Sequence, residues 1–97
     1  MSVERYDIND YTLSSITPGK IYTITFASLQ SYNSRLPETF DSAPQVDIGL
    51  LAKNEEVRPF LIDGSINTTQ FQVGIPYDLP QGVTSSKINI RVIGERA

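Results

Sequence analysis

Cysteine, histidine and tryptophan are all absent from this chain of 97 residues. Without thiols or imidazoles, the chain has no disulfide framework, no zinc site of the usual kind, and no catalytic pair built on cysteine or histidine. These absences remove the commonest catalytic and metal-binding arrangements. We therefore expect a protein that is not an enzyme and that needs no metal or cofactor.

Clusters of basic residues and long apolar runs are missing as well. The net charge is −3, and the eight basic residues are scattered singly, so nucleic acid and anionic membranes are poor partners. The first residues, Met-Ser-Val-Glu-Arg-Tyr-Asp, lack the apolar core of a signal peptide, and no window approaches the length of a membrane span. The sequence predicts a soluble chain.

Carboxylates are the remaining candidates for acid–base chemistry. Glu55 and Glu56 fall in a predicted turn, and Asp7 and Asp10 flank a predicted kink. Nothing in their spacing pairs any two of them across a cleft, so they are interpreted as solvated charges. The run 63–67 resembles the first half of a calcium loop but lacks the glycine at its sixth position, so it is predicted to be a turn.

Two stretches show the clearest strand pattern, an alternation of apolar and polar residues. Residues 69–75 and 87–93 each place three apolar side chains on one face, namely Phe71, Val73, Ile75, Ile88, Ile90 and Val92. Between them Pro76, Pro80 and Gly82 prevent a regular element. The pattern predicts two half-buried strands joined by a loop.

Further strands are predicted before this pair. Residues 17–20, Thr-Pro-Gly-Lys, match a type II turn, and residues 21–26 alternate with β-branched and aromatic members. Residues 46–51 and 57–62 are interpreted as a hairpin with its turn at 53–56. Because Pro59 lacks an N–H group, the second strand of that hairpin is expected at a sheet edge.

Residues 1–16 carry apolar side chains at irregular spacing. They predict a short edge strand, a kink and a second short strand. Two interpretations stay open: the segment pairs within its own domain, or it is an N-terminal arm that pairs with a neighbouring molecule.

Residues 27–45 form a long polar segment interrupted by Pro37 and Pro44. Leu29, Tyr32 and Leu36 have the spacing of one face of a short helix. A connection of this length is either a loop whose apolar residues cap the end of the fold or a contact surface. The second hypothesis rests on aromatic and arginine side chains, the types that dominate interfaces.

These signals together predict an all-β fold, a single domain spanning 1–97 with about seven strands in an immunoglobulin-like or related Greek-key β-sandwich. The strand at 46–50, the strand at 69–75, the Leu-Pro-Gln-Gly turn at 79–82 and the strand at 88–92 resemble the second half of an immunoglobulin-like module. Similar stretches occur in sandwich domains of secreted wall proteins and in small structural proteins of bacteriophages. The chain lacks the two cysteines and the tryptophan of antibody-type domains, and a jelly-roll-like arrangement is the alternative.

The resemblance implies a structural or interaction protein. The first hypothesis is a small virion component made in the host cytoplasm, such as a capsid decoration protein, bound to a larger protein assembly of capsid or other virion protein. A homo-oligomer stays open. The alternative is an extracellular carbohydrate-binding or adhesion module cut from a secreted protein. The candidate partner-binding residues are Tyr6, Ile8, Tyr11, Tyr32, Arg35, Leu36 and Phe40.

Overall fold

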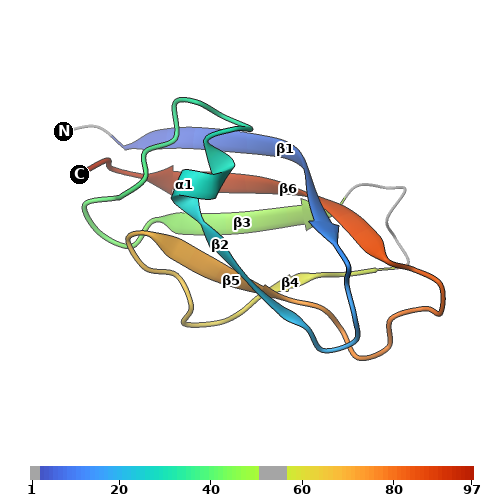
Figure 1. The fold of residues 1–97 in the computed structure, drawn as a ribbon. Helices are drawn as coiled ribbons and strands as arrows, with labels where there is room; N and C mark the ends of the chain where they lie inside the picture. Colours follow the sequence, from blue (N-terminus) through green and yellow to red (C-terminus); the bar gives the residue numbers. More distant parts are fainter. Residues whose placement is uncertain (1–2, 51–56) are drawn as a thin grey trace.

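The computed structural model describes residues 3–50 and 57–97. Within them two antiparallel sheets of three strands each form a β-sandwich, which confirms the predicted all-β fold (Figure 1). The strand order is β1-β6-β3 in one sheet and β2-β5-β4 in the other. The elements are β1 Glu4–Ser14, β2 Ile21–Thr25, α1 Phe26–Leu29, β3 Gln45–Leu50, β4 Phe60–Leu61, β5 Gln70–Gly74 and β6 Ser85–Gly94.

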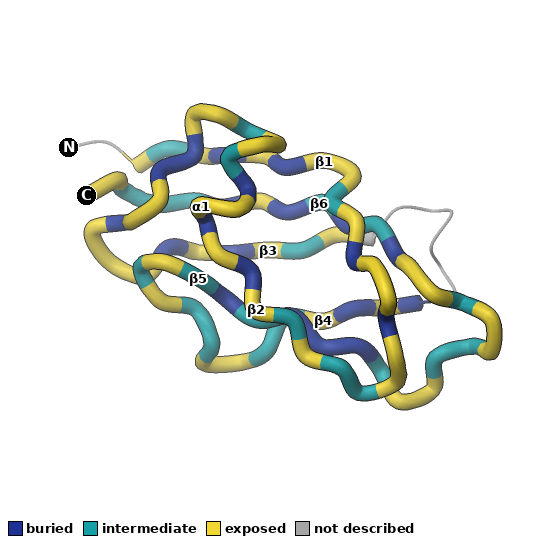
Figure 2. Tube along the Cα trace, in the orientation of Figure 1, coloured by how far each residue is buried: buried dark blue, intermediate teal, exposed yellow. Residues whose placement is uncertain are grey.

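The two clearest predicted strands are the central strands of the two sheets. Their alternation is confirmed, because Phe71 and Val73 of β5 and Ile88, Ile90 and Val92 of β6 are all buried. Figure 2 shows buried segments recurring along both strands, with less buried residues between them. A central strand has a neighbour on each side, so its inward face is fully covered and its sequence pattern is strongest.

One β-bulge accounts for the irregular spacing of the N-terminal segment. Residues 9 and 10 lie between the pairs Ile8–Ile90 and Tyr11–Ile88, so two residues of β1 stand opposite a single residue of β6. Asp10 adopts a left-handed backbone with φ 60°. The extra residue shifts the alternation of side chains by one position, so that apolar side chains on both sides of the bulge face the core. The expected pair of short strands is therefore one strand, paired within the domain.

The strand expected after the Thr-Pro-Gly-Lys turn is also present. The Lys20 N–H donates to the Thr17 carbonyl at 3.1 Å, and Gly19 has the positive φ, 75°, that this turn requires. On β2 the inward face carries Ile24, and the same phase continues to the buried Phe26.

A single helical turn, α1, follows β2 directly. The Thr25 side chain caps it by accepting from the Ser28 N–H at 3.3 Å. Phe26 and Leu29 are its buried residues, and the helix ends at Leu29. Tyr32 and Leu36 lie beyond this helix, so the predicted helix face shared with Leu29 is wrong.

The predicted hairpin of residues 46–51 and 57–62 is wrong. The first strand, β3, pairs with β6, whereas the second, β4, pairs with β5 in the opposite sheet. The chain thus crosses from one sheet to the other, and the turn expected at 53–56 lies outside the described residues. The edge position expected from Pro59 is confirmed, since β4 is the last strand of its sheet.

Candidate functional site

The loop after α1 lies along the outer edge of β1. The Asn33 Nδ2 donates to the Asp7 carbonyl at 3.1 Å, and the Arg35 guanidinium pairs with the Glu4 carboxylate at 3.3 Å. The Asn33 side chain thus satisfies a β1 carbonyl that could otherwise accept a hydrogen bond from another strand. The structure therefore brings together the two segments that the sequence nominated separately, the N-terminal strand and the 27–45 loop.

The exposed parts of these two segments form one surface, which we call the arm–loop surface and define as Glu4, Tyr11, Tyr32, Asn33 and Arg35. Tyr32 is 46% exposed, and its ring centroid lies 5.2 Å from that of the half-buried Tyr11. Burial raises the pKa of the Tyr11 phenol, with smaller contributions from Tyr32 and Tyr22. The phenol therefore stays neutral near pH 7 and can donate a hydrogen bond to a partner.

Tyr6 supports this surface from beneath. Its phenol donates to the Glu4 carboxylate at 2.7 Å, and the Arg35 guanidinium lies 5.9 Å from the centre of its ring. Burial, followed by this hydrogen bond to Glu4, raises the pKa of the Tyr6 phenol above 10.0. Arg35 is thus held by a carboxylate and an aromatic face, while 68% of its side chain stays exposed.

Four of the seven candidate partner-binding residues do not face solvent. Tyr6, Ile8, Leu36 and Phe40 are each 1% exposed or less. Their burial is a correction to the proposed contact set, because a side chain inside the core cannot touch a partner. For Leu36 and Phe40 the structure agrees with the other interpretation, in which the loop's apolar residues cap the end of the sandwich.

Phe40 shows why this loop is part of the core. Its ring packs edge-on against Phe26 at 4.9 Å and against Tyr6 at 6.1 Å between centroids. Its backbone N–H donates to the Thr68 carbonyl at 2.9 Å, and it forms an isolated bridge with Arg96. Phe40 therefore ties the loop to both sheets.

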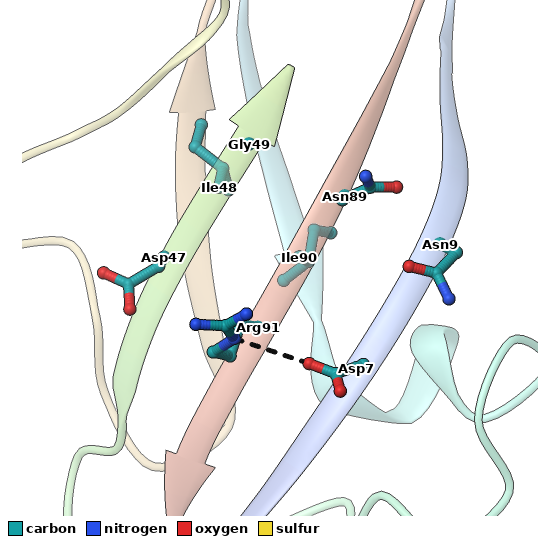
Figure 3. Close-up of a pocket in the computed structure, with 8 residues that line it drawn as sticks. All are labelled: Asp7, Asn9, Asp47, Ile48, Gly49, Asn89, Ile90 and Arg91. Carbon is teal, nitrogen blue, oxygen red and sulfur yellow. Dashed lines mark ion pairs between the residues drawn. The ribbon is translucent and has the colours of Figure 1, made fainter. Parts of the chain in front are cut away.

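A second polar feature, on the outer face of β1, β6 and β3, was not found from the sequence. Asp7, Arg91 and Asp47 form one row across the three strands. The Arg91 Nε lies 3.5 Å from the Asp7 carboxylate, and Figure 3 shows Arg91 between the two aspartates. Because the three residues are far apart in the chain, only the sheet register reveals the row.

This row borders a hollow of about 440 Å³ (Figure 3). A Cβ atom at Gly49 would have no atom within 4 Å, so the glycine borders open space. The Asn89 side chain, opposite Gly49 in the register, accepts from the Asp10 N–H at 3.1 Å. The lining residues are Asp7, Asn9, Asp47, Ile48, Gly49, Asn89, Ile90 and Arg91.

The outer face of the other sheet is more apolar. Ile21, Gly74 and Phe60 form one row across β2, β5 and β4. Ile21 is 58% and Phe60 48% exposed, and a Cβ atom at Gly74 would lie 2.7 Å from the Phe60 ring. The glycine thus provides the space in which that ring lies against the sheet.

No protein-family model matches the chain, and neither a curated protein nor a solved structure matches it. Throughout residues 3–50 and 57–97, no helix is long and apolar enough to cross a membrane. In the same residues, no three histidine, cysteine, aspartate or glutamate side chains are grouped so that they could hold a metal ion. The assignment of a function therefore depends on the surface features described above.

Proposed function

We propose that this chain is a non-enzymatic interaction protein that docks on a larger protein assembly through the arm–loop surface. In its most specific form, the proposal is a small virion component such as a capsid decoration protein, with capsid or other virion protein as its partner. One observation supports the proposal. The N-terminal strand and the 27–45 loop, which the sequence nominated separately, lie together in one surface that contains two tyrosines and an arginine.

These residue types suit such a contact. Tyrosine and arginine are enriched among residues that dominate binding energy, because they combine apolar area with hydrogen bonding. The ring contact between Tyr11 and Tyr32 and the bond from Arg35 to Glu4 restrain these side chains before binding. Less conformational entropy is then lost on association.

The mechanism is adhesion repeated over many copies. One surface of this size gives a modest affinity per copy, since few side chains are involved. If the chain forms a homo-oligomer, or if neighbouring copies on a lattice touch, effective concentration strengthens attachment without any new contact.

Sedimentation of the native chain in a lysate of its source tests this proposal. We expect it to move with a large particle, and to do so at moderate salt, because aromatic contacts are screened far less than exposed ion pairs. A chain that stays at the top of the gradient in low and moderate salt would contradict docking on an assembly.

A further inference from the structure

The hollow on the outer face of β1, β6 and β3 combines three kinds of polar side chain around one open space. Carboxylates come from Asp7 and Asp47, a guanidinium from Arg91 and an amide from Asn89. We propose that this hollow binds one neutral sugar unit through its hydroxyl groups. The inference is independent of docking through the arm–loop surface, and it gives the alternative hypothesis of carbohydrate binding a definite location.

Charge decides between classes of ligand. The carboxylates of Asp7 and Asp47 are balanced by two guanidinium groups. Arg91 stands between the two aspartates (Figure 3), 3.5 Å from Asp7, and Arg5 lies 3.2 Å from Asp7. Balanced charge gives neither an anion nor a cation a net attraction. A neutral ligand rich in hydroxyl groups needs no such attraction, because each hydroxyl both donates and accepts hydrogen bonds.

The side chains offer matching partners for such hydroxyls. The Asp47 carboxylate accepts from the Gln45 Nε2 at 3.1 Å and has several lone pairs in all, so it can also accept from a ligand hydroxyl. The Asn89 Oδ1 accepts from the Asp10 N–H, which orients the amide and leaves its Nδ2 group as a donor. The hollow thus presents an acceptor on β3 and a donor on β6.

The backbone around the hollow supports a binding role. Gly49 keeps the space open, since nothing lies within 4 Å of where its Cβ atom would be. On β1 the bulge holds Asp10 at φ 60° and places Asn9 in the lining of the hollow. Bulges and left-handed backbone at residues other than glycine concentrate beside functional sites.

The size of the hollow fits a small ligand, and its shape sets the affinity. A volume of about 440 Å³ is within the range of about 300–1,000 Å³ seen for small-molecule sites. None of the described residues that line the hollow is aromatic, so a sugar ring gains no stacking from them. We therefore expect a Kd of about 1 mM, corresponding to about −4 kcal/mol.

NMR titration of the ¹⁵N-labelled full chain tests the inference. The probes are D-glucose, D-galactose and N-acetyl-D-glucosamine, each added alone, with N-acetyl-arginine amide as a cationic probe. We expect saturable shifts for at least one sugar at the backbone amides of Asp47, Gly49 and Arg91 and at the Asn89 side-chain amide. Absence of saturable shifts with all three sugars overturns the proposal, as does saturation by the cationic probe alone.

Two variants locate the binding. Gly49→Val puts a strand-forming side chain into the hollow, and its Cβ atom meets no neighbour, so it should abolish the shifts. Asp47→Asn removes one charged acceptor and should raise Kd about tenfold, whereas the matched Asp63→Asn, in the exposed turn before β5, should leave Kd unchanged. Sugar binding that persists in both Gly49→Val and Asp47→Asn would overturn the assignment to the hollow.

Discussion

Replacing Phe40 with alanine should show that the 27–45 loop belongs to the core. The side chain is 1% exposed and packs on two aromatic rings, Phe26 and Tyr6. A buried Phe→Ala change costs about 3–5 kcal/mol, including about 0.5–1.5 kcal/mol for each aromatic pair. A chain of this length has about 5–15 kcal/mol of stability in all, so the variant should lose about a fifth of it or more.

Urea denaturation followed by circular dichroism measures this loss. With a slope of about 1–3 kcal/mol per molar urea, the midpoint should fall by about 2 M. The matched control is Phe60→Ala, because Phe60 is 48% exposed and should cost much less. A midpoint for Phe40→Ala equal to or above that of Phe60→Ala would refute the placement of Phe40 in the core.

Two further predictions concern polar groups in or near the core. Ser86 is 1% exposed, and its hydroxyl has no hydrogen-bond partner among the described residues. Because such a hydroxyl costs about 1–3 kcal/mol, Ser86→Ala should raise the free energy of unfolding by about 1 kcal/mol and so raise the urea midpoint. A lower midpoint would show that the hydroxyl is satisfied. For Tyr6, burial and the bond to Glu4 raise the folded-state pKa above 10.0. The unfolded chain therefore releases this proton first as pH rises. The contribution of the neutral Tyr6 phenol to stability is fully present below the unfolded pKa, and it is lost as pH rises through the folded pKa. Urea midpoints measured across this range should fall less in Tyr6→Phe than in the wild type, and equal falls would contradict the pKa assignment.

Sequence patterns predicted where the strands lie in the chain better than they predicted which strands pair with each other. Alternation located β2, β3, β5 and β6 because the inward face of each strand records its burial. It did not reveal that β3 and β4 lie in different sheets, since pairing depends on contacts between distant segments. The irregular spacing before Leu13 became interpretable only once the bulge at residues 9 and 10 was seen.

Only part of the candidate surface was predicted correctly, because burial also depends on contacts between distant segments. Tyr32 and Arg35 are exposed as expected, whereas Leu36 and Phe40 are buried. A polar loop with scattered apolar residues has the same sequence pattern whether those residues contact a partner or pack into their own core. The row of Asp7, Arg91 and Asp47 was missed because it exists only in the register of three strands.

Docking through the arm–loop surface is the central claim, and one comparison of variants in the same sedimentation gradient tests it most directly. The double variant Tyr32→Ser, Arg35→Ser changes exposed side chains of that surface, and Tyr77→Ser, Arg58→Ser is its control elsewhere on the molecule. With both variants folded, we expect the first to leave the particle, its affinity falling at least about tenfold, and the control to stay bound. Equal retention of both variants on the particle would contradict the claim.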